Sequence, residues 1–334
     1  MSLSVFAALV LAWNVLVILW GAYVRASGSG AGCGEHWPLC NGEVLPRAPE
    51  IETVIELTHR ATSGIALLLV LGLVVWAFRT RARGDRLRFW AAASGLFIVS
   101  EALLGAGLVL FGLVADDASP ARAFAMIAHL LNTFALLAAL ALATRWAAVP
   151  EAPRGAARGR VPALLVLAIV GLLAVATTGA VAALGNTLFP TRSLAEGLQQ
   201  DFSATSHFLL RLRVLHPILG VVVGVLAAVA AAVTAFQRGA QSVLQLAGAV
   251  ISLVVVQVFC GFATLLLLAP VWLQIVHLLL ADALWIALVL LASAARETAP
   301  LAARAHGRPR PSHDASSSPL ASRSSGSRSA TMPR

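Results

Sequence analysis

Four histidines lie inside strongly apolar segments of the chain, one on every second segment: His59, His129, His216 and His277. An imidazole in a lipid environment is costly unless it has a partner. A hydrogen bond between helices would satisfy any single one of them. Two pairs of imidazoles at a matched depth would instead form two metal sites, each with a ligand on either side. Haem iron in a helical bundle is bound in this way, and four histidines in related positions favour it.

The segments that carry these histidines are long enough to cross a membrane. Of the 334 residues, 59% are hydrophobic and only 12% are charged, which is typical of integral membrane proteins. A span needs about 20 apolar residues. The first apolar run has no basic stretch before it, so we interpret it as a span and not as a signal peptide. Eight spans are predicted, over residues 3–24, 53–78, 89–115, 123–147, 161–184, 206–236, 243–268 and 271–294.

The arginines predict the orientation of the spans. All 24 basic residues are arginine, and most lie in the loops 79–88 and 145–160 and in the tail from Arg296 onward. By the positive-inside rule, both termini are expected on the cytoplasmic side of the membrane. The net charge of +9 is thereby explained by topology, so membrane lipid is expected as a partner and nucleic acid is not.

The first four spans resemble the last four. Glu101-Ala-Leu-Leu-Gly105 in the third span matches Gln257-Val-Phe-Cys-Gly261 in the seventh, and the histidines match in the same order. We therefore predict an all-α membrane protein of two tandem four-helix bundles, related by a pseudo-two-fold axis along the membrane normal. The predicted parts are an N-terminal bundle at 1–148 with an external loop at 25–52, a cytoplasmic linker at 149–160, a C-terminal bundle at 161–296 and a disordered cytoplasmic tail at 297–334.

Two acidic residues lie near the predicted metal sites. Glu56 is one helical turn outside His59, where a carboxylate is a candidate proton acceptor, although an acid at a helix end can also simply reach water. The matching position in the second half is Arg213, so only one half has this acid. Glu101 lies near the middle of a span, where it would be protonated, hydrogen-bonded near a haem edge or engaged in packing.

Three arginines and two cysteines complete the candidate residues. Arg60, Arg211 and Arg213 lie at the outer ends of spans, where they are candidates for binding haem propionates or for anchoring the helices at the interface. Cys33 and Cys40 flank a short stretch with Gly and Pro and can close a small disulfide loop on the external side.

At this level of detail the chain resembles a known family. The stretch from Gly28 to Cys33, followed by Trp37-Pro-Leu-Cys40-Asn-Gly42, resembles the first external loop of the bacterial haem A synthases. Glu56-Leu-Thr-His59-Arg60 resembles the Glu-x-x-His-Arg signature of their second helix. The resemblance covers about residues 3–295.

The resemblance implies an activity. These enzymes oxidise the methyl group of haem O to the formyl group of haem A for terminal oxidases, by two hydroxylations that give a gem-diol, which loses water. It implies a haem b at His216 and His277, the substrate haem at His59 and His129, an essential Glu56, and a disulfide between the loop cysteines. A haem O synthase and an electron donor are candidate partners. Some members have a second cysteine pair, which the loop 185–204 lacks here.

Other functions fit the same histidines. A di-haem electron-transfer protein similar to cytochrome b561 would use both pairs without modifying haem, and a haem carrier or assembly factor would bind haem reversibly. A transporter is less favoured because no broken-helix substrate site is evident. Glu56 favours the enzyme, since electron transfer alone has little need for an acid beside one haem only.

Overall fold

Eight helical segments in residues 1–149 and 160–298, which the structure describes, are long and apolar enough to cross a membrane. This confirms the predicted number. In this computed structural model the elements are α1 (Leu3–Ala26), the short 3-10 helix η1 (Ser29–Ala31), α2 (Ile51–Thr80), α3 (Arg86–Leu110), α4 (Pro120–Ala147), α5 (Ala163–Leu188), α6 (Leu194–Phe202), α7 (Phe208–Arg213), α8 (Leu215–Arg238), α9 (Gln241–Leu266) and α10 (Val271–Glu297). The predicted linker and tail fall almost wholly outside the described residues.

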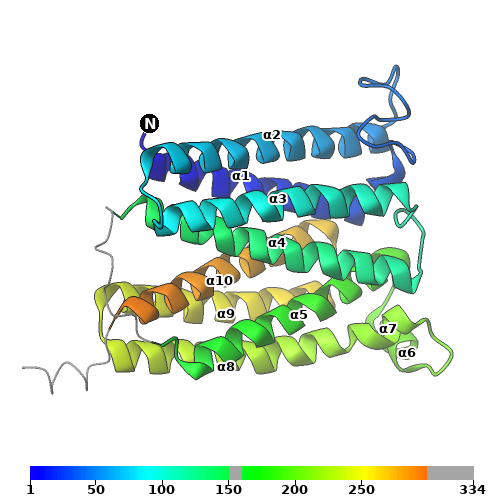
Figure 1. The fold of residues 1–334 in the computed structure, drawn as a ribbon. Helices are drawn as coiled ribbons and strands as arrows, with labels where there is room; N and C mark the ends of the chain where they lie inside the picture. Colours follow the sequence, from blue (N-terminus) through cyan, green and yellow to red (C-terminus); the bar gives the residue numbers. More distant parts are fainter. Residues whose placement is uncertain (150–159, 299–334) are drawn as a thin grey trace, which may run out of the picture.

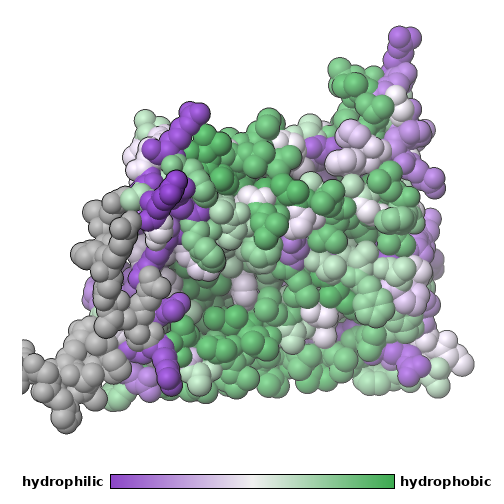
Figure 2. Space-filling view, viewed as in Figure 1, coloured by the Kyte–Doolittle hydropathy of each residue, from purple (hydrophilic) through white to green (hydrophobic). Residues whose placement is uncertain are grey.

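The long helices run side by side, and both the start of α1 and the end of α10 lie at the same end of the bundle (Figure 1). Figure 2 shows a broad hydrophobic band around the middle of the visible face and hydrophilic residues at both ends of the helices. Large aliphatic side chains such as Leu68, Leu96 and Val225 are exposed on the helices, as expected for a surface that contacts lipid. These are the features of a multi-pass membrane protein.

The buried apolar side chains form two main clusters. One is centred on α1 to α4 around residues such as Val70 and Leu137 and extends to Trp285 of α10, and the other unites α5, α8, α9 and α10 around Leu165 and Leu288. Figure 1 shows the corresponding two groups of helices stacked on one another. The first cluster therefore continues across the boundary between the two groups.

The two groups of helices are joined by specific contacts. On α10, the indole of Trp285 stacks on Phe134 of α4, with ring centroids 5.2 Å apart, and donates a 2.7 Å hydrogen bond to the Phe134 carbonyl. At the loop end of the bundle, Arg25 of α1 donates to the Ala183 carbonyl at 2.8 Å and to Thr187 Oγ1 at 2.6 Å. The interface is therefore held both at mid-depth and near one end.

The sixth span is interrupted. Pro217 has no backbone N–H to bond to the carbonyl of Arg213 four residues earlier, so α7 ends at Arg213 and α8 begins at Leu215. His216 thus lies in the first turn of α8, next to the interruption. Apolar periodicity alone predicted one continuous span here.

The loop before that span contains a helix that the sequence analysis did not predict. α6 is capped by Ser193, whose hydroxyl accepts from the Glu196 N–H. Leu194, Leu198 and Phe202 are exposed on one face at a spacing of four residues. Such an amphipathic helix at the end of a bundle is typical of a membrane interface.

The third and seventh spans end earlier than predicted, in the same motif. After α3, Gly112 has φ 65°, and the N–H groups of Gly112 and Leu113 bond back to the carbonyls of Val109 and Leu108. After α9, Leu268 has φ 59° in the matching position, with the same pattern of bonds. Both are Schellman ends, and they end α3 at Leu110 and α9 at Leu266, short of the predicted limits at 115 and 268.

Leu268→Gly is expected to stabilise the protein. A left-handed backbone costs a side chain with a β-carbon about 1 kcal/mol, and glycine avoids that cost. The midpoint of thermal unfolding in detergent should rise by about 2 °C. Gly112→Ala, at the matching position after α3, should lower the midpoint by a similar amount. A shift in the same direction for both substitutions would contradict the assignment of the two residues to matching left-handed positions.

Candidate functional site

The two histidines of the second half face one another. His216 at the start of α8 and His277 on α10 have ring centroids 6.2 Å apart, with the ring planes nearly perpendicular. A metal ion bound between two imidazoles requires about 6 Å between the ring centres, because each metal–nitrogen bond is about 2 Å long and each ring adds roughly 1 Å. The pair therefore already has the separation of two axial ligands.

Hydrogen bonds orient both rings of this pair. His216 Nδ1 lies 3.2 Å from the Val175 carbonyl of α5, and since a carbonyl only accepts, Nδ1 carries the proton and the lone pair of Nε2 is left for a ligand. The Gln257 side chain of α9 donates to His277 Nε2 at 3.3 Å. The Nδ1 atom of His277 is buried and has no partner within the described ranges.

In the first half, His59 lies on α2 and His129 on α4. The Nδ1 atoms of both are buried and without a hydrogen-bond partner among the described residues. His129 Nδ1 lies 3.5 Å from Glu101 Oε1 on α3, which is too long for a hydrogen bond but places the carboxylate beside the ring. That His59 and His129 form a pair like that of the second half stays a prediction.

Glu101 is held in place by α4. Its carboxylate accepts a 2.6 Å hydrogen bond from Asn132 Nδ2 and another from the Thr133 hydroxyl. In the second half, Gln257 occupies the matching position beside His277. The repeat therefore places one polar side chain beside a histidine in each half, charged when ionised in the first half and neutral in the second.

Glu56 is buried beneath the external loop, with only 3% of its surface exposed. Its Oε2 accepts from the Cys33 N–H at 2.8 Å, and its Oε1 accepts from Arg60 Nη2 at 2.5 Å. Arg60 also donates from Nη1 to the carbonyls of His36 and Leu39 at 2.5 and 2.6 Å. Cys33 and Cys40 form the predicted disulfide. Glu56 and Arg60 thus fasten the disulfide loop to α2, one turn from His59.

The other two candidate arginines differ from one another. Arg213 is engaged by Asp201 at 2.5 Å and by Asn186 Oδ1 at 3.2 Å. Arg211 is exposed and lines a cavity of about 380 Å³ together with Phe202 of α6. A role of Arg60, Arg211 and Arg213 toward propionates stays a prediction.

Comparison with known proteins places this arrangement in a family. Residues 4–289 match the family described as cytochrome oxidase assembly protein (COX15-CtaA). The chain belongs to that family. This confirms the relationship expected from the external loop and the Glu-x-x-His-Arg motif.

Individual relatives of this cytochrome oxidase assembly family carry two different names. The chain is 50% identical over 288 residues to a protoheme IX farnesyltransferase of Thermus thermophilus, an alignment that covers 86% of this chain and 47% of that protein. It is 42% identical over 140 residues to a heme A synthase of Halalkalibacterium halodurans, covering 42% and 46% of the two chains, and 46% identical over 98 residues to that of Shouchella clausii, covering 29% and 33%. The chain therefore spans at most about half the length of these relatives.

The histidine pairs fit the haem chemistry of the family. In the second half the ring separation of 6.2 Å is compatible with two imidazoles that hold one metal ion, although Gln257 bonds to Nε2 of His277 in this structure. The porphyrin would supply the remaining ligands, so two protein donors per half are sufficient.

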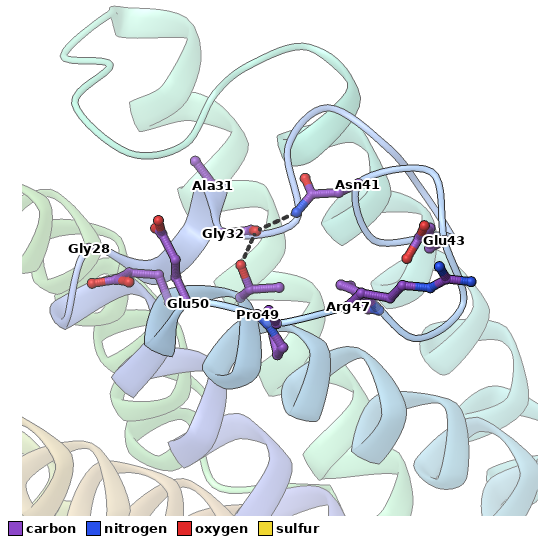
Figure 3. Close-up of a pocket in the computed structure, with 12 residues that line it drawn as sticks. Gly28, Ala31, Gly32, Asn41, Glu43, Arg47, Pro49 and Glu50 are labelled. Carbon is purple, nitrogen blue, oxygen red and sulfur yellow. Dashed lines mark hydrogen bonds between the residues drawn. The ribbon is translucent and has the colours of Figure 1, made fainter.

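A larger cavity lies elsewhere. It measures about 630 Å³ and is formed by the external loop and the start of α2, with Gly32, Asn41, Arg47 and Glu50 among its lining residues (Figure 3). Asn41 Nδ2 and the Thr53 hydroxyl both donate to the Gly32 carbonyl, and Figure 3 shows Asn41 directed toward that residue. None of the four membrane histidines lines it, so we do not associate it with haem.

Two residues were missed by the sequence analysis. Asp282 on α10 is 1% exposed, and neither carboxyl oxygen has a partner within the described ranges. Arg25 was assigned to a loop, but it bonds to α5 and α10. An isolated acid within an apolar span, five residues after His277, was the signal that should have identified Asp282.

Proposed function

We propose that this chain is a haem A synthase, which oxidises the methyl group of haem O to the formyl group of haem A. The observation that carries the proposal is the facing pair His216 and His277 in the second half, matched by the repeat to His59 and His129, with the buried, loop-bound Glu56 one turn from His59 only. Membership of the cytochrome oxidase assembly family and the relatives named heme A synthase support the same conclusion.

In this proposal the second half binds a resident haem b through His216 and His277. Conversion of the methyl group to formyl takes its oxygen from water and releases electrons and protons, and when bound that haem would pass the electrons to an external electron carrier. Val175 fixes the protonated nitrogen of His216, and Gln257 holds His277 by an uncharged contact. The neutral surroundings suit a cofactor that changes its charge but not its covalent structure.

The first half binds the substrate haem O between His59 and His129. Glu56 lies one turn from His59 and accepts protons released as the methyl group is oxidised, while Arg60 and the disulfide loop keep it oriented. The farnesyl tail of haem O keeps the substrate in lipid, which suits a site between membrane helices. The arginine distribution supports a topology with this loop outside and both termini in the cytoplasm.

The relative named protoheme IX farnesyltransferase offers a second activity. Its name describes the step that attaches a farnesyl group to haem, which precedes an oxidation of haem O. More than half of that protein lies outside the alignment, since only 47% is covered. The farnesyltransferase activity in its name can therefore reside in the part of that protein that this chain does not match. The joining of both parts in one protein would be consistent with a functional link between this chain and a haem O synthase.

The test is expression in bacterial cells that make haem O but lack their own haem A synthase, followed by mass spectrometry of the extracted haems. Haem A should appear in cells with this chain and not in cells with the empty vector. Recovery of unmodified haem O and haem b from a fully loaded, aerated preparation supplied with an external electron carrier would contradict the proposal and favour electron transfer or haem carriage.

A parallel culture that makes only haem b separates the two named activities. A farnesylated haem in that culture would identify a transferase and overturn the proposed oxidation. We expect no change in the haems of those cells, because the proposed reaction requires the farnesylated substrate.

Glu101 is expected to tune the first-half site. A carboxylate beside a ligand histidine makes the imidazole a stronger donor and stabilises oxidised iron, whereas an amide does so less. Glu101→Gln should therefore raise the midpoint potential of the first-half haem and leave that of the second-half haem unchanged. Unfolding stability should change by roughly 1 kcal/mol or less. Redox titration of the variant measures this, and an unchanged first-half potential would contradict the role.

A further inference from the structure

Each of the four membrane histidines lies against a glycine on a neighbouring helix. Gly21 of α1, Gly105 of α3, Gly179 of α5 and Gly261 of α9 face His59, His129, His216 and His277 respectively. In every case the ring atom nearest to the glycine is Cε1, which lies between the two nitrogens. The same ring edge is therefore presented to a glycine in all four places.

A side chain at three of these glycines would crowd the facing histidine ring. A β-carbon built on Gly21, Gly179 or Gly261 would lie 2.8, 3.0 or 3.2 Å from Cε1 of the facing histidine. Carbon atoms in contact prefer separations of about 3.5–4.0 Å. At Gly105 the corresponding distance is 3.8 Å, which is an ordinary contact. The four positions thus form a graded series within one protein.

At Gly179 the missing side chain also permits a hydrogen bond. The Val175 carbonyl lies one turn before Gly179, and His216 Nδ1 reaches it at 3.2 Å. A β-carbon at position 179 would lie 3.3 Å from that nitrogen and crowd the bond. The glycine therefore affects both where the ring lies and which nitrogen carries the proton.

On α3 and α9 the glycines share a helix face with the polar partners of the histidines. Glu101 precedes Gly105 by four residues, and Gln257 precedes Gly261 by four, so each pair lies on one face. The histidine ring thus lies beside a polar side chain on one helical turn and against the glycine backbone on the next turn. The motif Glu/Gln-x-x-x-Gly describes this contact surface in both halves.

We propose that these glycines are positioning residues, which fix the axial imidazoles by allowing each ring to lie directly on the backbone of the adjacent helix. The inference rests on the proposed function, because it treats the histidines as haem ligands. A residue with a β-carbon would displace the ring from the iron. Since a histidine ring is the mobile end of a side chain, the fold itself should tolerate that displacement.

The test compares three alanine variants of the haem-loaded protein. Gly179→Ala crowds His216, whereas Gly171→Ala on the same helix meets Val223 at an equal 3.0 Å, and Gly248→Ala meets nothing within 4 Å. We expect only Gly179→Ala to shift the low-spin electron paramagnetic resonance signal of the second-half haem and to weaken haem retention by about tenfold. Gly171→Ala should lower the unfolding midpoint and leave the spectrum unchanged.

The graded series gives a second measurement. Gly21→Ala should disturb the first-half site strongly, whereas Gly105→Ala should leave it close to normal. Equal spectra for Gly179→Ala and wild type, or equal spectral changes in Gly179→Ala and Gly171→Ala, would overturn the inference. A wild-type protein that binds haem but makes no haem A would refute the proposed oxidation while leaving this test intact, and one that binds no haem would refute both.

Discussion

Glu56→Gln is expected to lower haem A formation by about 10²- to 10⁴-fold, the usual contribution of a positioned acid or base, while haem content stays normal. Glutamine has nearly the same shape, and its carbonyl can still accept from the Cys33 N–H that Glu56 binds at 2.8 Å. It cannot take up a proton as a carboxylate does. The ratio of haem A to haem O in extracts, per amount of purified chain, measures the effect.

The matched control for this prediction is Glu52→Gln, an exposed acid one turn earlier on α2. It should leave the product ratio unchanged. If Glu56→Gln retained haem A formation to within roughly threefold, Glu56 would serve only to fasten the loop.

Arg60→Ala is expected to destabilise the disulfide loop by about 3 kcal/mol, since it leaves a buried carboxylate without its charged partner. Arg60 also donates to the His36 and Leu39 carbonyls, so those groups lose their bonds at the same time. Hydrogen exchange in residues 33–40 should become faster, and the midpoint of unfolding should fall. Arg60→Lys should restore little, because an ammonium cannot reproduce the guanidinium fork.

Arg47→Ala is the control for the loop. Arg47 is an exposed arginine of the same segment, so its loss should change exchange rates only locally. Similar exchange in Arg60→Ala and Arg47→Ala would show that the contacts of Arg60 contribute nothing to loop stability.

Much of the fold followed from composition and periodicity. Apolar segments of membrane-spanning length are the strongest signal that a sequence carries, and the predicted spans are all present. The residues at which the helices end were harder to predict, because a Schellman end depends on the backbone torsions of a few residues. One of these is Leu268, and leucine is not a residue type that signals a turn. The interruption before His216 was readable in principle from Pro217.

The site was predicted only in part. His216 faces His277 within the second half, as expected, and Glu101 of the third span lies beside His129. The loop carbonyls bound by Arg60 were not predictable, because a contact between an external loop and a helix has no periodicity. The glycines opposite the histidines were also hidden, since their significance depends on which helices are neighbours.

The most direct test of the account is the haem content of purified protein, measured together with electron paramagnetic resonance, for wild type, His129→Ala and His277→Ala. The account predicts one bis-imidazole haem in each half of the wild type, with each variant losing a different one. In His277→Ala the first-half haem should remain, and in His129→Ala the haem b should remain. A single haem lost in both variants, or an unchanged haem content in either, would contradict the assignment of one haem site to each half.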